Sequence, residues 1–417
     1  MKILIINQPL NNRGDESAHK ALVRMICKEI PNAQIQVLFV GANANSVLQF
    51  NVNNSNVQYI NLNWEKAFYK IAVSGLKHNN LRFLWNLHPT IRKIIKIYNN
   101  TDYVLCAPGG ICMGGFQNWL HLFFLKLSQY CNKPLFYYGR SFGPFPTKTK
   151  DNRIFKEISI EMLHYFSFLS IRDKKTEAIA KDLNINYVPT VDSAFLDSPQ
   201  AIIPNEIQSL ISAEKYMVFV PNLLIWHYAY KNVRKETILT FYCNIIDIIL
   251  NQYPDINIVM LPQTFNFRTY EGDDINLFEE IAQMKRNKKI IVIPDKYSSD
   301  IQQTIISKAE FLIGARYHSI VFAINNNIPF ISLSYEHKMT GLLQSLNKLD
   351  CSIDILETFT SVNKTQETLH SIQEKIPTIK KDINAQQQAK DIAKDCFIKF
   401  YNLIENKEVS FQNWRID

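Results

Sequence analysis

Short runs of apolar residues alternate along the chain with longer segments whose apolar residues recur every three or four positions. The short runs are apolar throughout, which is typical of strands that are buried on both faces of a parallel sheet. The longer segments have the period of amphipathic helices. In the first half this pattern predicts strands at 3–7, 35–40, 57–62, 103–107, 135–139 and 168–171, with helices that include 16–29, 119–130 and 174–183.

The same alternation starts again in the second half, after a stretch at 193–214 that breaks the rhythm and that we interpret as a linker. Here the pattern predicts strands at 217–221, 256–261, 290–293, 311–314 and 330–333, and helices at 233–252, 274–286, 299–308 and 319–326. A last long helix is predicted at 382–406.

The expected fold is α/β, with two doubly wound, Rossmann-like parallel-sheet domains that face a cleft. The predicted domains are 1–195 and 215–375, and the segment 380–417 is expected to pack back on the first of them. Ligands of such sheets bind beyond the carboxyl ends of the strands. Candidate chemistry is therefore sought where strands end.

The composition is that of a globular protein, and it indicates the compartment in which the protein is expected. The chain has 417 residues, 47% of them hydrophobic and 20% charged, which is enough for two domains with separate cores. The seven cysteines are odd in number and include no CxxC pair, which argues against a disulfide framework and a structural zinc site. Neither a signal-peptide pattern nor a window of about 20 apolar residues occurs, so we expect a reduced, cytoplasmic protein without a membrane span.

The net charge of +8 fits an anionic substrate, a membrane surface or a nucleic acid. A nucleic-acid partner is not expected, because the sequence contains neither a block of Lys and Arg nor a nucleic-acid-binding motif.

The most informative strand end is Arg316-Tyr317-His318-Ser319, which directly follows an apolar run. Residues two apart in an extended chain point the same way, so Arg316 and His318 are expected to share one face, with Ser319 near the cap of the next helix. A fixed cation, a titratable imidazole and a helix N-terminus suit a small dianion whose reaction needs a proton transfer. In the alternative, Arg316 pairs with a carboxylate and His318 caps the helix.

A second arginine, Arg172, also follows an apolar strand. A guanidinium binds carboxylate or phosphate through a planar fork. Arg172 and Arg316 are thus expected to hold the two ends of one anion. The alternative is a surface pair between Arg172 and Asp173, which contributes little.

Loops after other strands supply weaker candidates. Gly14, Asp15 and Glu16 occupy the place of a phosphate loop, but neither GxGxxG nor GxxxxGK[ST] is present. Asp15 and Glu16 suit a sugar-hydroxyl or general-base role, and equally the stabilisation of a helix N-terminus. Gly109 and Gly110 permit close backbone approach to a ligand, or simply form a tight turn.

Further polar residues at strand ends are candidate substrate contacts, each with a structural alternative such as turn formation, capping or core packing. Lys338 is suited to a phosphate group as a point charge. These candidates are Arg140, Ser141, Gln263, Ser319, Tyr335 and Lys338.

These pieces, in this order, resemble the polysaccharide pyruvyl transferase family between about residues 5 and 345. The landmarks are Gly14-Asp15-Glu16, Pro108-Gly109-Gly110, Ser141-Phe142-Gly143-Pro144, Ile171-Arg172-Asp173, Asp192-Ser193-Ala194-Phe195, Leu261-Pro262-Gln263, Gly314-Ala315-Arg316-Tyr317-His318-Ser319 and Ile328-Pro329, with Tyr335 and Lys338 downstream. The sequence departs from the family at Arg140, where the family more often has Gln.

The resemblance implies a two-lobed fold similar to one class of glycosyltransferases, the GT-B type. It implies phosphoenolpyruvate as co-substrate, no metal or organic cofactor, and a pyruvate ketal on a sugar, here a galactose-type residue of a surface-polysaccharide precursor. It also implies that Arg172, Arg316 and His318 are functional residues, with His318 as the proton donor. The acceptor sugar, its lipid linkage and the oligomeric state stay open.

Two other functions are weighed against this one. A nucleotide-sugar glycosyltransferase of the same architecture would need a carboxylate for the ribose, for which Asp295 is the candidate. A non-catalytic carbohydrate-binding protein would use Trp226 and Tyr228 as a stacking platform. A peripheral membrane contact is also expected from aromatic residues in Lys- and Arg-rich segments, unless these rings simply form the core; the residues are Trp64, Phe68, Tyr69, Trp85 and Trp119.

Overall fold

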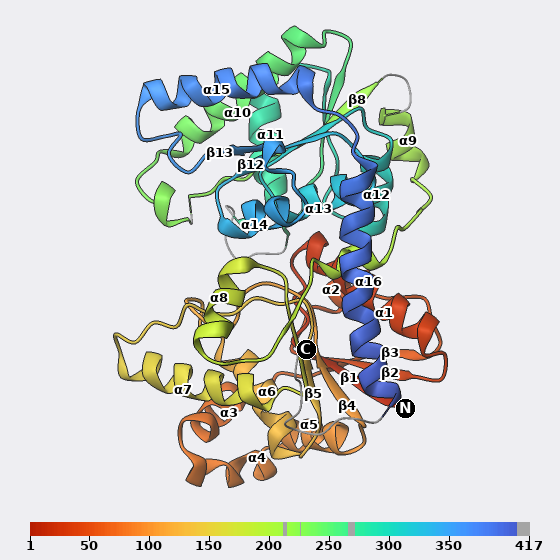
Figure 1. Cartoon of the computed structure of the whole chain (residues 1–417), viewed down its shortest axis with the longest axis vertical. Helices are drawn as coiled ribbons and strands as arrows, with labels where there is room; N and C mark the ends of the chain where they lie inside the picture. The colour runs from red at the N-terminus through yellow and green to blue at the C-terminus, as the bar shows by residue number, and fades with distance from the viewer. Residues whose placement is uncertain (212–214, 226, 266–271, 407–417) are drawn as a thin grey trace. The chain divides into compact units, whose positions relative to one another are not determined.

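The apolar strands form two parallel sheets, and the chain divides into two units around them (Figure 1). The computed structural model describes residues 1–211, 215–225, 227–265 and 272–406. The first unit comprises residues 1–10, 18–197 and the chain from 391 onwards, and the second comprises 11–17 and 198–390. The predicted fold class of two doubly wound parallel sheets is confirmed.

The first sheet has the strand order β3-β2-β1-β4-β5-β6-β7, and all its described pairs are parallel. The order reverses between β1 and β4, which is where ligands of doubly wound sheets bind. Its strands are β1 (Lys2–Ile6), β2 (Gln34–Val40), β3 (Val57–Leu62), β4 (Tyr103–Cys106), β5 (Leu135–Tyr137), β6 (Phe168–Ile171) and β7 (Val188–Pro189).

Alternate side chains of each strand enter cores on opposite faces of this sheet. Leu4 and Ile6 of β1 pack with helices α3 to α8, whereas Ile3 and Ile5 pack with α1, α2 and α16. Both faces are thus covered, and this explains why the strands are apolar throughout. These helices are α1 (Arg13–Glu29), α2 (Ala44–Gln49), α3 (Phe68–Lys77), α4 (Phe83–Leu87), α5 (Pro89–Asn99), α6 (Trp119–Tyr130), α7 (Lys150–Tyr165), α8 (Lys174–Asp182) and α16 (Ile383–Glu405).

The end of α16 belongs to the core of the first unit. Phe400 packs its ring against the rings of Phe136, Tyr138 and Phe168, at centroid distances of 5.5 to 5.7 Å. Cys396 and Ile404 are buried in the same cluster. Aromatic packing of this kind explains why the last helix returns to the strands of the first half of the chain.

The second sheet has the order β10-β9-β8-β11-β12-β13, again parallel, and it reverses between β8 and β11. Its strands are β8 (Tyr216–Val220), β9 (Asn257–Met260), β10 (Ile290–Val292), β11 (Leu312–Gly314), β12 (Phe330–Ser334) and β13 (Ser352–Asp354). The helices of this half are α9 (Asn205–Ile211), α10 (Lys235–Gln252), α11 (Asp274–Lys285), α12 (Ser299–Ser307), α13 (Tyr317–Asn325), α14 (His337–Ser345) and α15 (Val362–Lys375).

The observed division of the chain differs from the predicted boundaries. Residues 11–17, predicted in the first domain, pack with the second unit, and so do 376–390. The stretch 193–214, interpreted as a linker, contains a short 3-10 helix at Ser193–Leu196 and the helix α9, and its residues 212–214 lie outside the described residues.

Candidate functional site

The polar residues of the second unit gather at the carboxyl ends of four neighbouring strands. Asn222 follows β8, Gln263 and Thr264 follow β9, Arg316 follows β11, and Tyr335 follows β12. Because β8 and β11 flank the point where the strand order reverses, Asn222 and Arg316 occupy the place where a doubly wound sheet binds its ligand.

Arg316 is held by a buried carboxylate. Its guanidinium forms an ion pair with Asp274, whose side chain is 1% exposed, and donates to Oγ1 of Thr264 at 3.0 Å. Burial by itself lowers the pKa of Arg316, but the charge and hydrogen bond of Asp274, together with the nearby hydroxyls of Tyr335 and Tyr242, outweigh burial and raise that pKa above its ordinary value. Among the described residues, the buried Nε of Arg316 has no hydrogen-bond partner. The arginine is therefore charged, fixed in direction, and able to donate to a ligand.

Asp274 is a residue that the sequence analysis missed. One of its carboxylate oxygens accepts from the backbone N–H groups of Gln263 and Thr264, at 2.9 and 3.0 Å, while the other binds Arg316. It thereby joins the start of α11 to the end of β9 and positions Arg316. An acidic residue at a helix start is ordinarily interpreted as a helix-stabilising charge, so the sequence carried no signal that distinguished this one.

The predicted geometry of Arg316 and His318 is wrong. The strand β11 ends at Gly314, Arg316 is the N-cap residue of α13, and His318 lies inside the first turn of that helix. The two side chains therefore do not alternate along an extended strand. Ser319 lies near the cap, as predicted: it is in the first turn, where its hydroxyl donates to the carbonyl of Arg316 at 2.6 Å.

His318 instead packs directly against Gly14. A Cβ atom added to Gly14 would lie 1.8 Å from both Cγ and Nδ1 of the His318 ring, so only glycine fits at this position. His318 is 7% exposed, and the ring of Tyr317 packs edge-on to its ring at 5.0 Å. Gly14, predicted to lie at the place of a phosphate loop, therefore contacts the ring of the candidate proton donor.

Residues 11–17, which include the first turn of α1, belong to the second unit and not to the first domain as predicted, while their contact with an acceptor stays a prediction. The backbone N–H of Arg13 donates to the carbonyl of Gln263 at 2.8 Å, and Asn12 forms a bridge with Thr264. Glu16 is fully buried, binds Arg13 at 2.7 Å and accepts from the backbone N–H of Ser299 at 3.0 Å. Glu16 thus serves the fold, whereas Asp15 next to it is only half-buried.

The other candidates of the second unit differ in their surroundings. Tyr335 is 6% exposed, and its hydroxyl accepts from Nδ2 of Asn222 at 3.0 Å, which joins the ends of β8 and β12. Gln263 is buried beside Asp274. Lys338 is half-exposed and forms an ion pair with Glu336 at 2.8 Å. Tyr335 and Gln263 therefore belong to the strand-end cluster, and no contact joins Lys338 to that cluster among the described residues.

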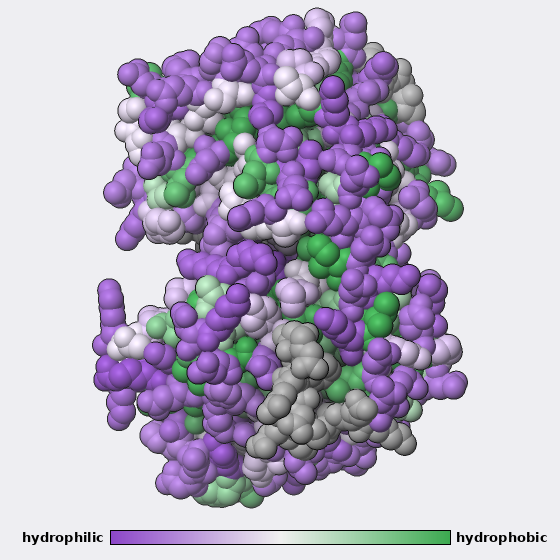
Figure 2. Space-filling model, in the orientation of Figure 1, coloured by the Kyte–Doolittle hydropathy of each residue, from purple (hydrophilic) through white to green (hydrophobic). Residues whose placement is uncertain are grey.

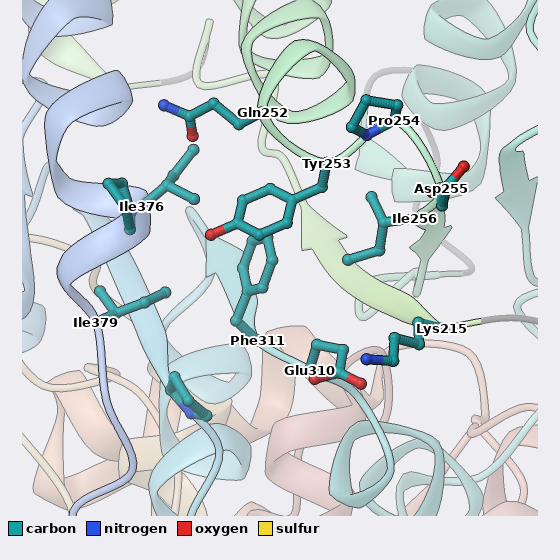
Figure 3. A pocket seen from close by; sticks show the side chains of 12 residues that line it. Lys215, Gln252, Tyr253, Pro254, Asp255, Ile256, Glu310, Phe311, Ile376 and Ile379 are labelled. Atoms are coloured by element: carbon teal, nitrogen blue, oxygen red, sulfur yellow. The ribbon is translucent and has the colours of Figure 1, made fainter.

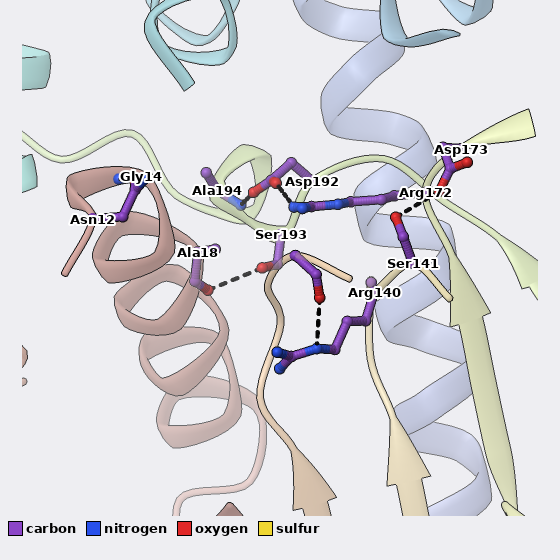
Figure 4. Close-up of polar contacts among 12 residues, drawn as sticks. Asn12, Gly14, Ala18, Arg140, Ser141, Arg172, Asp173, Asp192, Ser193 and Ala194 are labelled. Atoms are coloured by element: carbon purple, nitrogen blue, oxygen red, sulfur yellow. Dashed lines mark hydrogen bonds and ion pairs between the residues drawn. The ribbon is translucent and has the colours of Figure 1, made fainter. Parts of the chain in front are cut away.

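In the first unit, Arg172 is also held by a buried aspartate. It forms an ion pair with Asp192, whose side chain is fully buried, rather than the surface pair with Asp173 that was the alternative to anion binding (Figure 4). Asp173 is the N-cap of α8 and accepts from Ser141 Oγ at 2.5 Å and from Thr176 Oγ1 at 2.7 Å. The Ser141 hydroxyl is thus engaged within the protein.

Arg140, predicted to contact substrate, is engaged with the backbone of the first unit. It is 1% exposed, and its guanidinium donates to the carbonyls of Ala107, Gly110 and Asn7 at 2.7, 3.1 and 3.2 Å. The Arg140 guanidinium also lies close to Gly109, 3.3 Å from where a Cβ of this glycine would be. These bonds tie the ends of β1, β4 and β5 together, so we assign Arg140 to positioning the loop of Gly109 and Gly110.

A pocket of about 440 Å³ lies at the opposite edge of the second sheet (Figure 3). Lys215, Ile256 and Phe311, which line it, come immediately before or at the starts of β8, β9 and β11. The amino ends of parallel strands are not where such sheets bind substrates, so this pocket is not the candidate active site.

Three further features bear on the class of protein. Within the described ranges, no three His, Cys, Asp or Glu side chains gather as a metal site would require. None of the described helices is long and apolar enough to cross a membrane. Trp226, half of the predicted stacking platform, lies outside the described residues, while Tyr228 is 78% exposed.

The fold of this chain is similar to that of several solved structures. The chain is similar over its whole length to a solved structure of MnaA with UDP from S. aureus, with a TM-score of 0.58, 12% identity and full coverage of that chain. UGT89C1 of Arabidopsis thaliana matches 98% of this chain and 99% of its own, with a TM-score of 0.55 and 12% identity. At these identities the likeness shows the GT-B-type fold alone.

Sequence comparison adds the family. The amylovoran biosynthesis protein AmsJ of Erwinia amylovora is 22% identical over 233 residues, which is 54% of each protein, so the chain spans about half the length of this relative. The family model for polysaccharide pyruvyl transferases matches residues 13–337, a range that includes Arg172, Asp192, Asp274, Arg316 and His318. The chain therefore belongs to the polysaccharide pyruvyl transferase family.

Proposed function

We propose that this protein transfers the pyruvyl group of phosphoenolpyruvate to a sugar of a surface-polysaccharide precursor and closes a pyruvate ketal there. The observation that carries the proposal is Arg316, a charged guanidinium at the strand-order reversal of the second sheet that is fixed by Asp274 and Thr264. The family match and the relative named for amylovoran biosynthesis support the same reaction class.

Phosphoenolpyruvate suits this arginine because it carries a carboxylate and a phosphate. Both groups are planar or forked acceptors, which a guanidinium binds with more than one N–H. With one side of its guanidinium occupied by Asp274 and Thr264, Arg316 presents its remaining donors, including Nε, in a fixed direction. We assign donor binding to the second unit on this basis.

The proposed reaction has two additions. A proton is delivered to the methylene carbon of phosphoenolpyruvate, which leaves positive character on the neighbouring carbon. A sugar hydroxyl adds to that carbon and loses its proton. The bond from this carbon to the phosphate oxygen then breaks, inorganic phosphate leaves, and a second hydroxyl of the sugar adds and loses its proton to close the ketal. Arginine charge stabilises the departing phosphate.

We assign the first proton transfer to His318. Imidazole is the side chain suited to exchange a proton near neutral pH, and His318 lies in the first turn of the helix that Arg316 caps. The alternative His19 is excluded by its surroundings, since burial lowers its pKa to about 3 and its ring contacts the Tyr59 hydroxyl at 3.1 Å. His337, at the start of α14, is exposed.

The acceptor is assigned to the first unit, around Gly109 and Gly110, where Arg140 holds the loop after β4 beside the strand-order reversal. We propose a lipid-linked saccharide as its natural form. Arg172 lies in the same unit, two strands along the sheet from β4. Its contact with the donor's second anionic group stays a prediction.

The test follows phosphate release from phosphoenolpyruvate in the presence of galactosides. His318→Asn is expected to lower turnover by at least about 100-fold, as for a general acid, with little change in phosphoenolpyruvate affinity. His337→Asn is the matched control and should retain turnover. Turnover above a tenth of wild type in His318→Asn would assign the proton to another residue. Protection from thermal unfolding by nucleotides but not by phosphoenolpyruvate would instead favour a nucleotide-sugar glycosyltransferase.

A further inference from the structure

The positive charge of this chain is concentrated in one stretch of the first unit, residues 64–99. This stretch contains seven Lys or Arg residues and one acid, Glu65, so it carries six of the chain's net eight positive charges. The helices α3, α4 and α5 make up most of it. The seven basic residues are Lys66, Lys70, Lys77, Arg82, Arg92, Lys93 and Lys96.

Large hydrophobic side chains are exposed on the same stretch. Trp64 and Tyr69 are 48% and 47% exposed, and Phe83 and Leu87 are 57% and 65% exposed. Phe83 and Leu87 are four residues apart on α4 and therefore share one side of that helix. Figure 2 shows pale green hydrophobic residues among purple hydrophilic ones at the lower edge of the view, over α4. Apolar groups rimmed by charge mark interaction sites more often than ordinary surface.

The three helices meet in a rigid arrangement. His88, at the start of α5, contacts the carbonyl of Lys66 at 3.3 Å, and its ring packs against Phe68 of α3 at 5.9 Å. Trp85 of α4 is fully buried, and its indole N–H donates to the carbonyl of Ile71 at 3.3 Å. Phe83 and Leu87 are therefore on the exposed side of α4, and Trp85 on its other side is packed in the core.

Most of the charges in this stretch are available to an outside partner. Lys66, Lys70, Arg92, Lys93 and Lys96 are exposed, and none of them forms an ion pair with the described residues. Lys77 is different, since it pairs with Asp151 at 2.7 Å. A solvated helix face ordinarily mixes both signs of charge, whereas this stretch contains seven basic residues and one acid together with exposed aromatic and aliphatic side chains.

We propose that this basic helical surface, residues 64–99, docks the protein on an anionic lipid bilayer. Anionic membranes attract clustered Lys and Arg, Trp and Tyr favour the membrane interface, and Phe and Leu gain by entering the acyl boundary. The buried core of a protein–protein interface is depleted of charged residues. A surface with five exposed cations and four exposed apolar side chains does not have that composition. Docking is independent of the pyruvyl chemistry and would bring the first unit to a lipid-linked acceptor.

The test is flotation of the full chain with vesicles of phosphatidylcholine, with and without about one third phosphatidylglycerol, at physiological salt. Wild type is expected to float with the anionic vesicles only. Because each basic residue near an anionic surface contributes about fivefold to binding, removing three should weaken it about 100-fold. The variant is Lys66→Ser, Lys70→Ser and Arg92→Ser, and its matched control removes equal charge elsewhere by Lys28→Ser, Lys296→Ser and Lys364→Ser.

A second pair of variants separates apolar insertion from charge. Phe83→Ser with Leu87→Ser should weaken vesicle binding, while Leu48→Ser with Val362→Ser, two other exposed aliphatic residues, should leave it unchanged. Equal binding to neutral and anionic vesicles, or equal losses in the test and control variants, would overturn the proposal. Self-association of the chain that Phe83→Ser abolishes, without vesicle binding, would assign the surface to a protein partner instead. Phosphate release with a lipid-free galactoside should be unchanged in all four variants.

Discussion

Replacing Gly14 with Ala tests whether the contact between the start of α1 and His318 positions the catalytic candidate. An added Cβ would lie 1.8 Å from Cγ and Nδ1 of His318 and 2.5 Å from its Cβ. Rotation of the ring about χ1 would relieve the first two contacts but not the third. The backbone of α1 or α13 must therefore move.

The size of that movement follows from the contact distances. Carbon atoms pack at about 3.5–4.0 Å, so the contact between the two Cβ atoms requires a shift of about 1 Å. A misplacement of about 1 Å at a reacting group can cost on the order of 100-fold in rate. Overpacking of a core costs about 1–3 kcal/mol in the free energy of unfolding. Helix propensity acts in the opposite direction, since Ala is favoured over Gly inside a helix by up to about 1 kcal/mol.

The matched control is Gly341→Ala in α14. Gly341 is also a helical glycine, but no atom lies within 4 Å of where its Cβ would be. Denaturant unfolding should therefore show Gly341→Ala stabilised by up to about 1 kcal/mol and Gly14→Ala destabilised by about 1–2 kcal/mol. Phosphate release should be normal in Gly341→Ala and lowered by about 100-fold in Gly14→Ala.

The free energy of unfolding tests the packing of His318 against Gly14, and turnover tests the role of His318 in the reaction. A Gly14→Ala protein as stable as Gly341→Ala would refute the packing of His318 against Gly14. A destabilised Gly14→Ala protein with unchanged turnover would leave the packing intact and remove His318 from the reaction.

Two further predictions concern charge. Arg316→Lys should lower turnover to within about tenfold of Arg316→Ala, because an ammonium keeps the charge beside Asp274 but cannot donate in two fixed directions at once; steady-state phosphate release measures this, and near-normal turnover in the lysine variant would contradict the forked contact. Burial lowers the pKa of His19 in the folded protein to about 3, below its ordinary value of 6.5. Between these two pH values the unfolded chain binds one proton at His19 that the folded protein does not. The free energy of unfolding therefore decreases as pH falls from about 6.5 towards 3. The slope of unfolding free energy against pH in this window should be smaller in His19→Gln by up to about 1.4 kcal/mol per pH unit, and an unchanged slope would show that His19 does not contribute.

The strands were predictable from the sequence because burial on both faces makes them apolar throughout. The runs at 57–62 and 168–171 coincide with β3 and β6 at both ends. The pattern missed β7 (Val-Pro) and β13 (Ser-Ile-Asp), because neither strand contains a run of apolar residues that would distinguish it from a loop. The fold class followed from the long strands alone.

The start of α13 shows where local pattern fails. Ser319 has the residue type of an N-cap, but the helix begins two residues earlier and Arg316 occupies the cap position. Arg316 can replace a side-chain cap here because its backbone carbonyl accepts from both the N–H and the hydroxyl of Ser319. That arrangement depends on Gly314, since a Cβ there would lie 2.1 Å from the Ser319 hydroxyl.

The placement of residues 11–17 could not be predicted from the sequence. These residues follow β1 directly along the chain, which favours the first domain on grounds of proximity. Their partners Gln263, Thr264 and Ser299 are distant in sequence, and nothing in a local pattern specifies a hydrogen bond between such segments. Asp192 and Asp274 could not be predicted as partners of Arg172 and Arg316 because they too are distant from them in sequence.

Those two aspartates change how anion binding by this family member is understood. Each strand-end arginine is paired with a carboxylate that is at most 1% exposed, so each pair is close to neutral as a unit. A neutral pair attracts a distant anion weakly, and affinity must then come from hydrogen bonds made at contact. Such bonds are sensitive to the direction of the guanidinium, which the aspartate fixes. In the proposed anion site, selectivity for a carboxylate or phosphate over a simple anion would therefore follow from orientation, while the long-range positive charge lies on α3, α4 and α5.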